Sequence, residues 1–247
     1  MSVKRFVYDR ANDALRPWGV QIVRGFTNNA GIKSFIPAKS TIARAKRERV
    51  SVTDYIDKHN ATLGATEATV VAMLRLAGLG GNVQRICEIG PGTGRYAERV
   101  ISALNPDVYE MYETARDWLP YLARLPGAKL QPADGYTLSA TESGSVDLVH
   151  ANKVFVYVPL VVTAGYLGEM SRVVRPGGAV AFDVVTDDCM DEATTEAWIA
   201  QRATLYTMLS RQWVIDFLGR RGLTLLGSSF ATLSGGRTEL LVFRKAR

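Results

Sequence analysis

The fold is decided by the stretch Arg85-Ile86-Cys87-Glu88-Ile89-Gly90-Pro91-Gly92-Thr93-Gly94-Arg95-Tyr96. A short β-branched run ends in an acid, three glycines follow at alternate positions, and a helical pattern begins at once. Strand, glycine turn and helix in this order form the entry to a nucleotide-binding α/β unit. Glycine adopts backbone dihedrals that a Cβ forbids and lets a ligand approach bare backbone. The following helix begins with free N–H groups and a partial positive charge, which favour an anion there.

The spacing of the glycines indicates which nucleotide the loop binds. The dinucleotide fingerprint G-x-G-x-x-G needs a glycine at position 95, where this chain has an arginine; its third glycine falls one residue earlier. The loop reads acid-x-Gly-x-Gly-x-Gly and resembles the first motif of the class I S-adenosylmethionine (SAM) dependent methyltransferases. This resemblance implies that SAM is the cofactor and that its contacts here come from Glu88, Gly90, Gly92, Thr93 and Gly94. A nicotinamide-dependent oxidoreductase is the alternative interpretation of such a loop.

Later positions complete the predicted cofactor site. Glu113 follows a strand expected at 108–112 and lies nineteen residues after Gly94, close to the offset of ~20 at which an acid accepts both ribose hydroxyls. Methyltransferases of this class commonly place an acid after the third strand, here expected at 128–133, to accept a hydrogen bond from the adenine amino group. Asp134 with Gly135 matches that position, although an Asp-Gly pair also makes an ordinary turn. Asn152 lies at the C-terminal edge of the fourth strand, expected at 146–151, where this sheet class binds ligands.

The remaining pattern extends the resemblance to residues 83–244. A helix is expected at 161–174, then the turn 175–178 and a strand at 179–185, a helix at 213–218, and strands at 223–230 and 238–243. The closing hairpin puts an antiparallel strand on a parallel sheet, as this family does. The expected fold is therefore α/β: a doubly wound, mostly parallel seven-stranded sheet with a final antiparallel strand and an N-terminal helical cap. We divide the chain into a basic helical arm or cap, 1–60, and a SAM-binding methyltransferase domain, 61–247.

The N-terminal arm carries short helical patterns. Ser40 or Thr41 is expected to cap one helix and Ser51 the next, and a further helix at 64–79 is expected to end at a glycine pair, 80–81. By position the arm is like the variable cap of class I methyltransferases, which often folds over the cofactor and helps to select the substrate. Tyr55, Asp57 and His59 are therefore candidates to face the site, with packing or solvent exposure as the alternative.

The arm also holds the excess of positive charge. Residues 1–60 contain 12 Lys/Arg and 5 Asp/Glu, whereas the remainder contains 18 and 19. Such an arm suits an anionic substrate, a membrane surface or nucleic acid, although a solvated helical face that only aids solubility has the same composition. Trp18 and Phe26, with the apolar residues and arginines around them, suggest an interfacial segment for a lipid-linked substrate, and ordinary packing explains them as well. Peripheral membrane contact is left open, nucleic acid is disfavoured, and the oligomeric state is not indicated.

The predicted reaction is methyl transfer to a small molecule. Because the methyl group of SAM sits on a sulfonium, the enzyme mainly has to fix the acceptor against it, with a base as an option. A hydroxyl oxygen gains most from a base, and an anionic or carrier-linked acceptor, such as a glycan precursor, suits the basic arm and a lid expected at 191–209. His150 is the candidate base, with a satisfied core histidine as the alternative. Tyr157 and Asp187 are candidates to orient the acceptor.

Other classes are disfavoured by the absence of their motifs from the sequence. Methyltransferases acting on amide or base nitrogens often carry Asn/Asp-Pro-Pro-aromatic after strand four, where this chain has Asn152-Lys153-Val154-Phe155. Nitrogen or nucleic-acid acceptors stay as alternatives, as does a SAM-binding module without activity. No cysteine–histidine cluster has metal-ligand spacing, so no metal is expected. The longest apolar run, 154–167, is too short for a membrane span, no signal peptide is visible, and Cys87 and Cys189 are expected as free thiols, which favours a cytoplasmic protein.

Overall fold

The computed structural model describes residues 14–15, 17, 36–80, 83–201 and 206–247. The chain divides into two compact units, Met1–Phe35 and Ile36–Arg247, of which the second contains the sheet and its helices. The predicted interfacial segment around Trp18 and Phe26 lies outside the described residues. Within the described ranges, none of the helices combines the length and the apolar character that crossing a bilayer requires.

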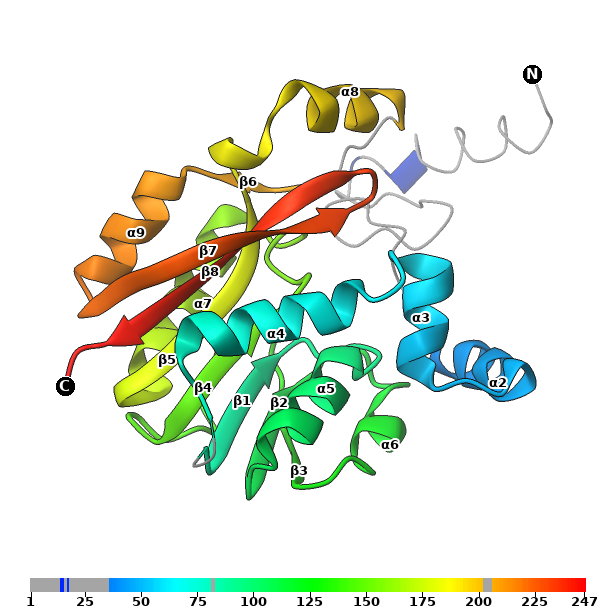
Figure 1. Ribbon diagram of the computed structural model, residues 1–247, viewed down its shortest axis with the longest axis horizontal. Helices are drawn as coiled ribbons and strands as arrows, with labels where there is room; N and C mark the ends of the chain where they lie inside the picture. The colour runs from blue at the N-terminus through cyan, green and yellow to red at the C-terminus, as the bar shows by residue number, and fades with distance from the viewer. Residues whose placement is uncertain (1–13, 16, 18–35, 81–82, 202–205) are drawn as a thin grey trace. The chain divides into compact units, whose positions relative to one another are not determined.

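An eight-stranded sheet forms the centre of this unit, in the order β3-β2-β1-β4-β5-β8-β7 with β6 paired to β5. The first five strands of this order run parallel, whereas β8 runs antiparallel to both β5 and β7. Figure 1 shows β7 and β8 as a long antiparallel pair. The predicted doubly wound sheet with an antiparallel strand is confirmed, and the short β6 is an addition that the sequence pattern did not indicate. The strands are β1 Arg85–Ile89, β2 Val108–Tyr112, β3 Ala128–Gln131, β4 Val146–Ala151, β5 Val174–Thr186, β6 Met208–Leu209, β7 Leu223–Leu233 and β8 Gly236–Lys245.

The strand order reverses between β1 and β4. From β1 the chain continues to β2 and β3 on one side, and β4 and β5 lie on the other. The loops that follow β1 and β4 therefore leave in opposite directions, which opens the crevice where α/β sheets bind ligands. Glu88 of β1 and His150 of β4 are paired in register near the carboxyl ends of these strands. The fold thus brings the residues predicted after β1, β2 and β4 to one edge of the sheet.

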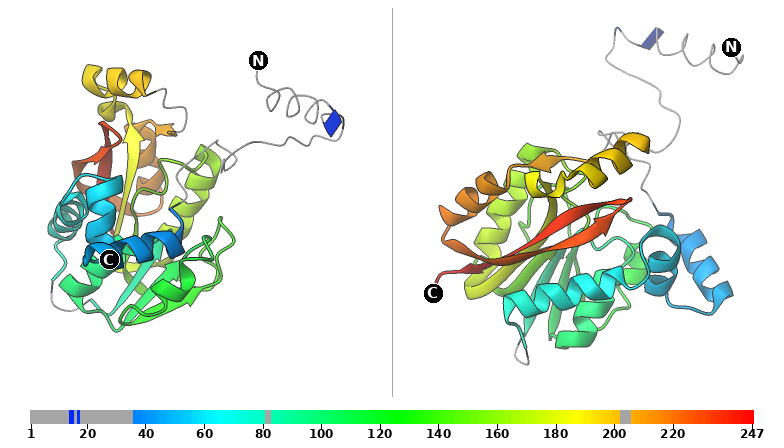
Figure 2. Two further views of the ribbon diagram at one scale, coloured as in Figure 1. Left: turned by 90° about the vertical axis from the view of Figure 1, so that its right-hand side faces the viewer. Right: turned by 45° about the horizontal axis from the view of Figure 1, so that its top comes forward.

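Helices cover both faces of the sheet (Figure 2). Side chains alternate along the strands, so that Ile86 joins a buried cluster with α4 and α5, whereas Cys87 joins a second cluster with α7 and α9. Burying a large apolar side chain contributes roughly 1.5–3 kcal/mol, so both clusters hold the helices firmly to the sheet. The helices on the sheet and at its edges are α4 Ala65–Ala77, α5 Arg95–Leu104, α6 Leu119–Leu122, α7 Leu160–Val173, α8 Glu192–Ala200 and α9 Arg211–Gly219.

Local capping decides where the first described helices begin and end. The side chain of Ser51 accepts a backbone hydrogen bond at 2.9 Å and caps α3 (Val52–Asn60), as predicted. Helix α2 (Ala38–Glu48) begins directly after Pro37, so the prediction of Ser40 or Thr41 as its cap is wrong. Proline at this position has its φ, −68°, already set by the ring. Helix α4 ends at Gly78, before the predicted glycine pair, because Gly78 adopts the left-handed conformation that closes a helix.

Helices α2 and α3 share the core of the larger unit. Ala45 of α2 and Val52 and Ile56 of α3 belong to the same buried cluster as α4 and α5. Part of the predicted cap therefore folds together with the sheet, and the boundary at residue 60 stays a prediction about where the SAM-binding domain begins.

Candidate functional site

The glycine loop after β1 needs its glycines. Gly90, Gly92 and Gly94 have φ values of 62°, 53° and 77°, in the left-handed region that other residues rarely adopt. A Cβ on Gly90 would lie 2.7 Å from a methyl carbon of Val154, in the loop after β4. The loop then turns into α5, whose first residues have no side-chain cap among the described residues. The free N–H groups of the first turn of α5 therefore remain available to an anion.

Glu113 lies against this loop. Its carboxylate accepts hydrogen bonds from the N–H of Gly92 and the N–H of Ala115, each at 2.6 Å. The residue is only 9% exposed, and burial raises the pKa of its carboxyl group. A carboxylate has about four acceptor positions, so acceptor capacity remains for hydroxyl groups. The structure thus brings the acid after β2 and the glycine loop into direct contact.

Glu88, His150 and Asn152 meet in the interior rather than on an open surface. The hydroxyl of Tyr109, from β2, donates to Glu88 at 2.8 Å and lies 2.7 Å from Nε2 of His150. The amide nitrogen of Asn152 lies 3.0 Å from Nδ1 of the same ring. Burial raises the pKa of Glu88 to about 8 and lowers that of His150 to about 3. We call these four residues the β1–β4 polar cluster.

The environment of His150 argues against its predicted role as a base. The side chain is completely buried, and both ring nitrogens already have partners. A base must reach the proton it removes, and an acceptor cannot reach this ring as it lies in the structure. The alternative of a satisfied core histidine describes it better. Asn152 differs, because its Oδ1 is buried and has no hydrogen-bond partner among the described residues.

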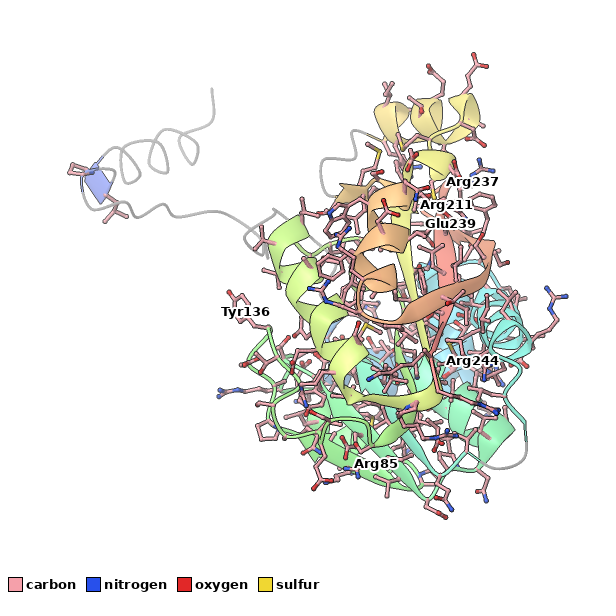
Figure 3. All side chains as sticks on the ribbon, turned by 90° about the vertical axis from the view of Figure 1, so that its left-hand side faces the viewer. Arg85, Tyr136, Arg211, Arg237, Glu239 and Arg244 are labelled. Atoms are coloured by element: carbon pink, nitrogen blue, oxygen red, sulfur yellow. The ribbon has the colours of Figure 1, made fainter. Side chains whose placement is uncertain are left out.

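The Asp134-Gly135 turn is built as an ordinary Asx turn. Asp134 is exposed and accepts hydrogen bonds from the backbone of Tyr136 and Thr137 at 2.8 and 2.7 Å and from the Thr137 hydroxyl at 2.6 Å. The Thr137 hydroxyl and these backbone N–H groups hold the pKa of the Asp134 carboxyl group below its usual range. Gly135 has a φ of 83°, and Tyr136 projects from the fold beside it (Figure 3). The turn alternative is thus realised, and contact of Asp134 with an adenine stays a prediction.

Tyr157 and Asp187 lie in different surroundings. The ring of Tyr157 is half-buried and lies 5.8 Å from that of Tyr206, which in turn lies 4.6 Å from the ring of Trp198. Burial raises the pKa of Tyr157 to about 12, so it remains a neutral hydrogen-bond donor. Asp187 is exposed and accepts the N–H of Arg211 at 2.7 Å, where α9 begins. Figure 3 shows the Arg211 side chain near Glu239, and the ion pair between them measures 2.8 Å. Asp187 therefore fastens α9 in this structure, and its role toward an acceptor stays a prediction.

Arg95, at the start of α5, has a defined ion-pair partner. It occupies the position where the dinucleotide fingerprint would have its third glycine. Arg95 forms an ion pair of 3.3 Å with Asp57 of α3, and the buried carboxylate of Asp57 also accepts from Thr66 at 2.5 Å. Of the three candidates in the cap, Asp57 therefore contacts the helix that follows the glycine loop. Tyr55 is buried in the core, whereas His59 pairs with a surface acid. The pairing joins elements far apart in the sequence, so no local pattern indicated it.

Lys153 and Asp183 form a second contact that the sequence did not reveal. Lys153 follows Asn152 with a φ of 57°, which is uncommon for a residue with a side chain. Its N–H and its ammonium both bond to the buried carboxylate of Asp183, at 2.6 and 2.7 Å, and Thr238 of β8 donates to the same carboxylate at 2.7 Å. The signal in the sequence is an aspartate inside an apolar strand, because a buried carboxylate must have a partner. This carboxylate holds the turn that places Asn152 and Val154.

A family model described as "Methyltransferase domain" matches residues 65–227. The chain belongs to this family. The matched segment contains the glycine loop, Glu113 and the turn after β4, and the methyltransferase uses S-adenosylmethionine as its cofactor. The predicted family, enzyme class and cofactor are therefore confirmed.

Solved methyltransferases have a similar fold at low sequence identity. Magnesium protoporphyrin IX methyltransferase from Synechocystis PCC 6803, with bound S-adenosylhomocysteine, is 11% identical with a TM-score of 0.57, over 98% of this chain and 100% of that chain. The N-methyltransferase NodS from Bradyrhizobium japonicum WM9, also with S-adenosylhomocysteine, is 17% identical with a TM-score of 0.57, over 84% and 99%. An O-methyltransferase family protein from Burkholderia thailandensis is 16% identical with a TM-score of 0.55, over 85% and 63%. A search of curated proteins found no match.

Proposed function

We propose that this methyltransferase acts on a hydroxyl oxygen of a small, anionic or carrier-linked molecule and holds SAM across the glycine loop. The observation that carries the cofactor site is the contact of 2.6 Å between the Gly92 N–H and Glu113, which fixes an acid beside bare backbone. In this site the free acceptor positions of Glu113 take the ribose hydroxyls. The first turn of α5, with Arg95, takes the methionyl carboxylate.

The residues present fit the cofactor on two counts. Among the described residues, the atom nearest to a Cβ added at Gly92 is the Gly90 carbonyl oxygen at 4.0 Å, so the backbone there is bare and open to a ligand. The Oδ1 of Asn152 is buried and has no hydrogen-bond partner within the described ranges, which is costly unless a donor arrives. The ammonium of the methionyl group is such a donor. When bound, SAM supplies a methyl group activated by its sulfonium, and the chain's own residues bind, orient and exclude water.

The preference for oxygen rests on the segment after β4. Phe155 is completely buried between Tyr166 and Phe182, so it does not offer the aromatic face that amide- and base-methylating enzymes use after this strand. The half-buried rings of Tyr157 and Tyr206 form the polar aromatic surface beside it. Since the buried His150 is not available as a base, the proposed reaction depends on placing the acceptor against the methyl group.

The preference for an anionic acceptor rests on α2. The exposed positions of this helix and its C-cap carry five basic residues, and its acid, Glu48, is engaged by Lys58 and His59. Nucleic acid is the second candidate partner for this surface, because a row of exposed cations also suits phosphates. The basic residues are Lys39, Arg44, Lys46, Arg47 and Arg49.

Calorimetric titration tests the cofactor site. We expect S-adenosylhomocysteine to bind and NAD not to bind. Glu113→Ala is expected to weaken binding by about tenfold to a hundredfold, because hydrogen bonds to a charged group contribute ~1.5–3 kcal/mol. Glu142→Ala, an exposed acid outside the site, is the matched control and is expected to bind normally. Tight NAD binding, or equal affinity of both variants, contradicts the proposed site.

Transfer from radiolabelled SAM tests the acceptor class. We expect label in hydroxyl compounds, more in those with a phosphate or carboxylate, and less transfer to them in Arg44→Gln/Arg47→Gln. Label confined to amines would show that the acceptor atom is nitrogen. Transfer that grows with oligonucleotide length and falls steeply with salt would identify nucleic acid instead.

A further inference from the structure

The β1–β4 polar cluster places four polar side chains in the interior, beside the apolar cluster that contains Ile86 and Leu148. Glu88, Tyr109, His150 and Asn152 are each at most 4% exposed, and burying such groups is unfavourable unless all of them are hydrogen-bonded. Glu88 and His150 lie on the sheet face that α4 and α5 cover, since they share strand parity with Ile86 and with Leu148. Tyr109 belongs to the same buried cluster, and Asn152 follows directly after β4. The proposed function uses Asn152 alone, so the other three residues need an explanation.

The hydrogen bonds of the cluster have a defined direction. The hydroxyl of Tyr109 has a single hydrogen and donates it to Glu88 at 2.8 Å, so it must accept from Nε2 of His150 at 2.7 Å. A neutral imidazole with its hydrogen on Nε2 has a bare Nδ1, and burial keeps this ring neutral by lowering its pKa to about 3. The bare Nδ1 accepts from the amide nitrogen of Asn152 at 3.0 Å. The amide oxygen of Asn152 is then the atom that faces away from the cluster.

Reversing these bonds would turn the amide around. A protonated Glu88 could donate to Tyr109, which would then donate to Nε2 and leave the hydrogen of His150 on Nδ1. The oxygen of Asn152 would turn to that hydrogen, and its NH₂ group would face outward. Burial, opposed by the hydrogen bond from Tyr109 and by Arg95 and reinforced by Glu113, raises the pKa of Glu88 to about 8. Both arrangements are therefore accessible near neutral pH, but an ammonium group can bind only to the first.

We propose that Glu88, Tyr109 and His150 are positioning residues that turn the amide of Asn152 so that its oxygen receives the amino group of the cofactor's methionyl moiety. The inference rests on the proposed cofactor site. It gives the buried acid of the glycine motif a function: its charge selects the direction of a chain of three hydrogen bonds. Binding of the ammonium in turn favours the ionised form of Glu88.

Comparing two ligands isolates this effect. S-adenosylhomocysteine carries the amino group, and 5′-methylthioadenosine lacks the whole amino-acid moiety but keeps the adenosine. Tyr109→Phe is expected to weaken the binding of S-adenosylhomocysteine by about tenfold, which is the contribution of one hydrogen bond to a charged group. The affinity for 5′-methylthioadenosine is expected to change by less than about twofold. Tyr112→Phe is the matched control, because this buried tyrosine of the same strand bonds to Thr141 instead, and we expect no change for either ligand.

A further variant separates failure of this inference from failure of the site. Asn152→Ala is expected to show the same selective loss as Tyr109→Phe. If Asn152→Ala shows the loss and Tyr109→Phe does not, the positioning role is overturned and the cofactor site stands. If the unmodified protein binds neither ligand, the proposed cofactor site itself is wrong.

The state of the His150 ring can be measured directly in the unmodified protein, so the test does not depend on whether a variant folds. The chain has two histidines, and His59→Gln assigns the ring signals. In ¹⁵N-labelled protein saturated with S-adenosylhomocysteine, we expect the long-range ¹H–¹⁵N pattern of a neutral ring with its hydrogen on Nε2. A hydrogen on Nδ1 would overturn the proposal, because the oxygen of Asn152 would then be engaged by the ring.

Discussion

Gly90→Ala is the substitution that tests the geometry of the cofactor loop most directly. The residue has a φ of 62°, and the added Cβ would come within 2.7 Å of Val154, which belongs to the loop after β4. Gly92→Ala is a matched control two residues away. Gly92 has a φ of 53°, but the nearest atom to its added Cβ, the Gly90 carbonyl oxygen, lies 4.0 Å away. The two variants thus share the strained backbone and differ in the steric contact.

The expected losses of unfolding free energy follow from these two terms. A left-handed conformation costs a residue with a side chain ~1–2 kcal/mol, and crowding a packed contact costs ~1–3 kcal/mol more. We therefore expect about 1–2 kcal/mol for Gly92→Ala and about 2–5 kcal/mol for Gly90→Ala. The effect of alanine on the unfolded chain is the same at both positions and cancels in their difference. Truncating Val154 to alanine in the Gly90→Ala protein should recover most of the crowding term.

Urea unfolding measures these terms when it is applied to the unmodified protein, to Gly90→Ala, Gly92→Ala and Val154→Ala, and to the double variant at positions 90 and 154. Calorimetry for S-adenosylhomocysteine accompanies each measurement. We expect an interaction energy of ~1–3 kcal/mol between positions 90 and 154, such that the double variant is more stable than the sum of the two single losses predicts. Cofactor affinity should fall in Gly90→Ala and recover in part together with stability. Equal losses for Gly90→Ala and Gly92→Ala, with no recovery in the double variant, would refute the argument that the two loops are packed against each other at this point.

Three further predictions concern other parts of the fold. Asp183→Asn leaves Lys153 with a partly buried, unpaired charge and is expected to lower the unfolding free energy by about 3 kcal/mol in urea; an unchanged midpoint would contradict the pairing. Burial lowers the pKa of His150 in the folded state to about 3, below the unfolded value near 6.5, so its contribution to stability is present above pH 6.5 and is lost as the pH falls toward 3. Between pH 4 and 6.5, this contribution makes the unfolding free energy fall by about 1.4 kcal/mol per pH unit as the pH is lowered. In His150→Gln, urea unfolding over the same range should lack this slope. Identical pH profiles of the variant and the unmodified protein would show that the ring is accessible to protons. Ser51→Ala is expected to lower stability by ~1 kcal/mol through loss of the α3 cap, whereas Ser40→Ala should be nearly neutral, and the reverse order in thermal unfolding would disagree with the observed helix starts.

Elements with a strong local pattern are predictable from the sequence. The strands Val108–Tyr112 and Val146–Ala151 have the predicted bounds, because short apolar runs between turn signals leave little choice of register. Ser51 is recognisable as a cap because a short polar side chain before a helix satisfies a free N–H. The start of α2 differs from its prediction because the proline before it already fixes a suitable φ, so the later serine and threonine are not needed as caps.

The candidate site is predictable in part for a related reason. The glycine loop and Glu113 follow from spacing, and the structure brings the two into contact, whereas their binding of the cofactor stays a prediction. The surroundings of His150 and Lys153 depend on partners from other strands, Tyr109 and Asp183, whose pairing is set by the tertiary fold. A histidine near the carboxyl end of a strand has the same local pattern whether it faces the crevice or the core. Its burial therefore had to come from the structure.

The bond from Lys153 to Thr238 joins the turn after β4 to a strand 85 residues further along the chain. During synthesis on the ribosome, that turn cannot gain its final support until β8 has emerged and paired with β5. Until then, Asp183 of β5 alone holds the turn, through the N–H and the ammonium of Lys153, and we expect the binding crevice to be incomplete. Ligand-dependent protection from proteolysis should accordingly begin late in translation, when the antiparallel strand docks.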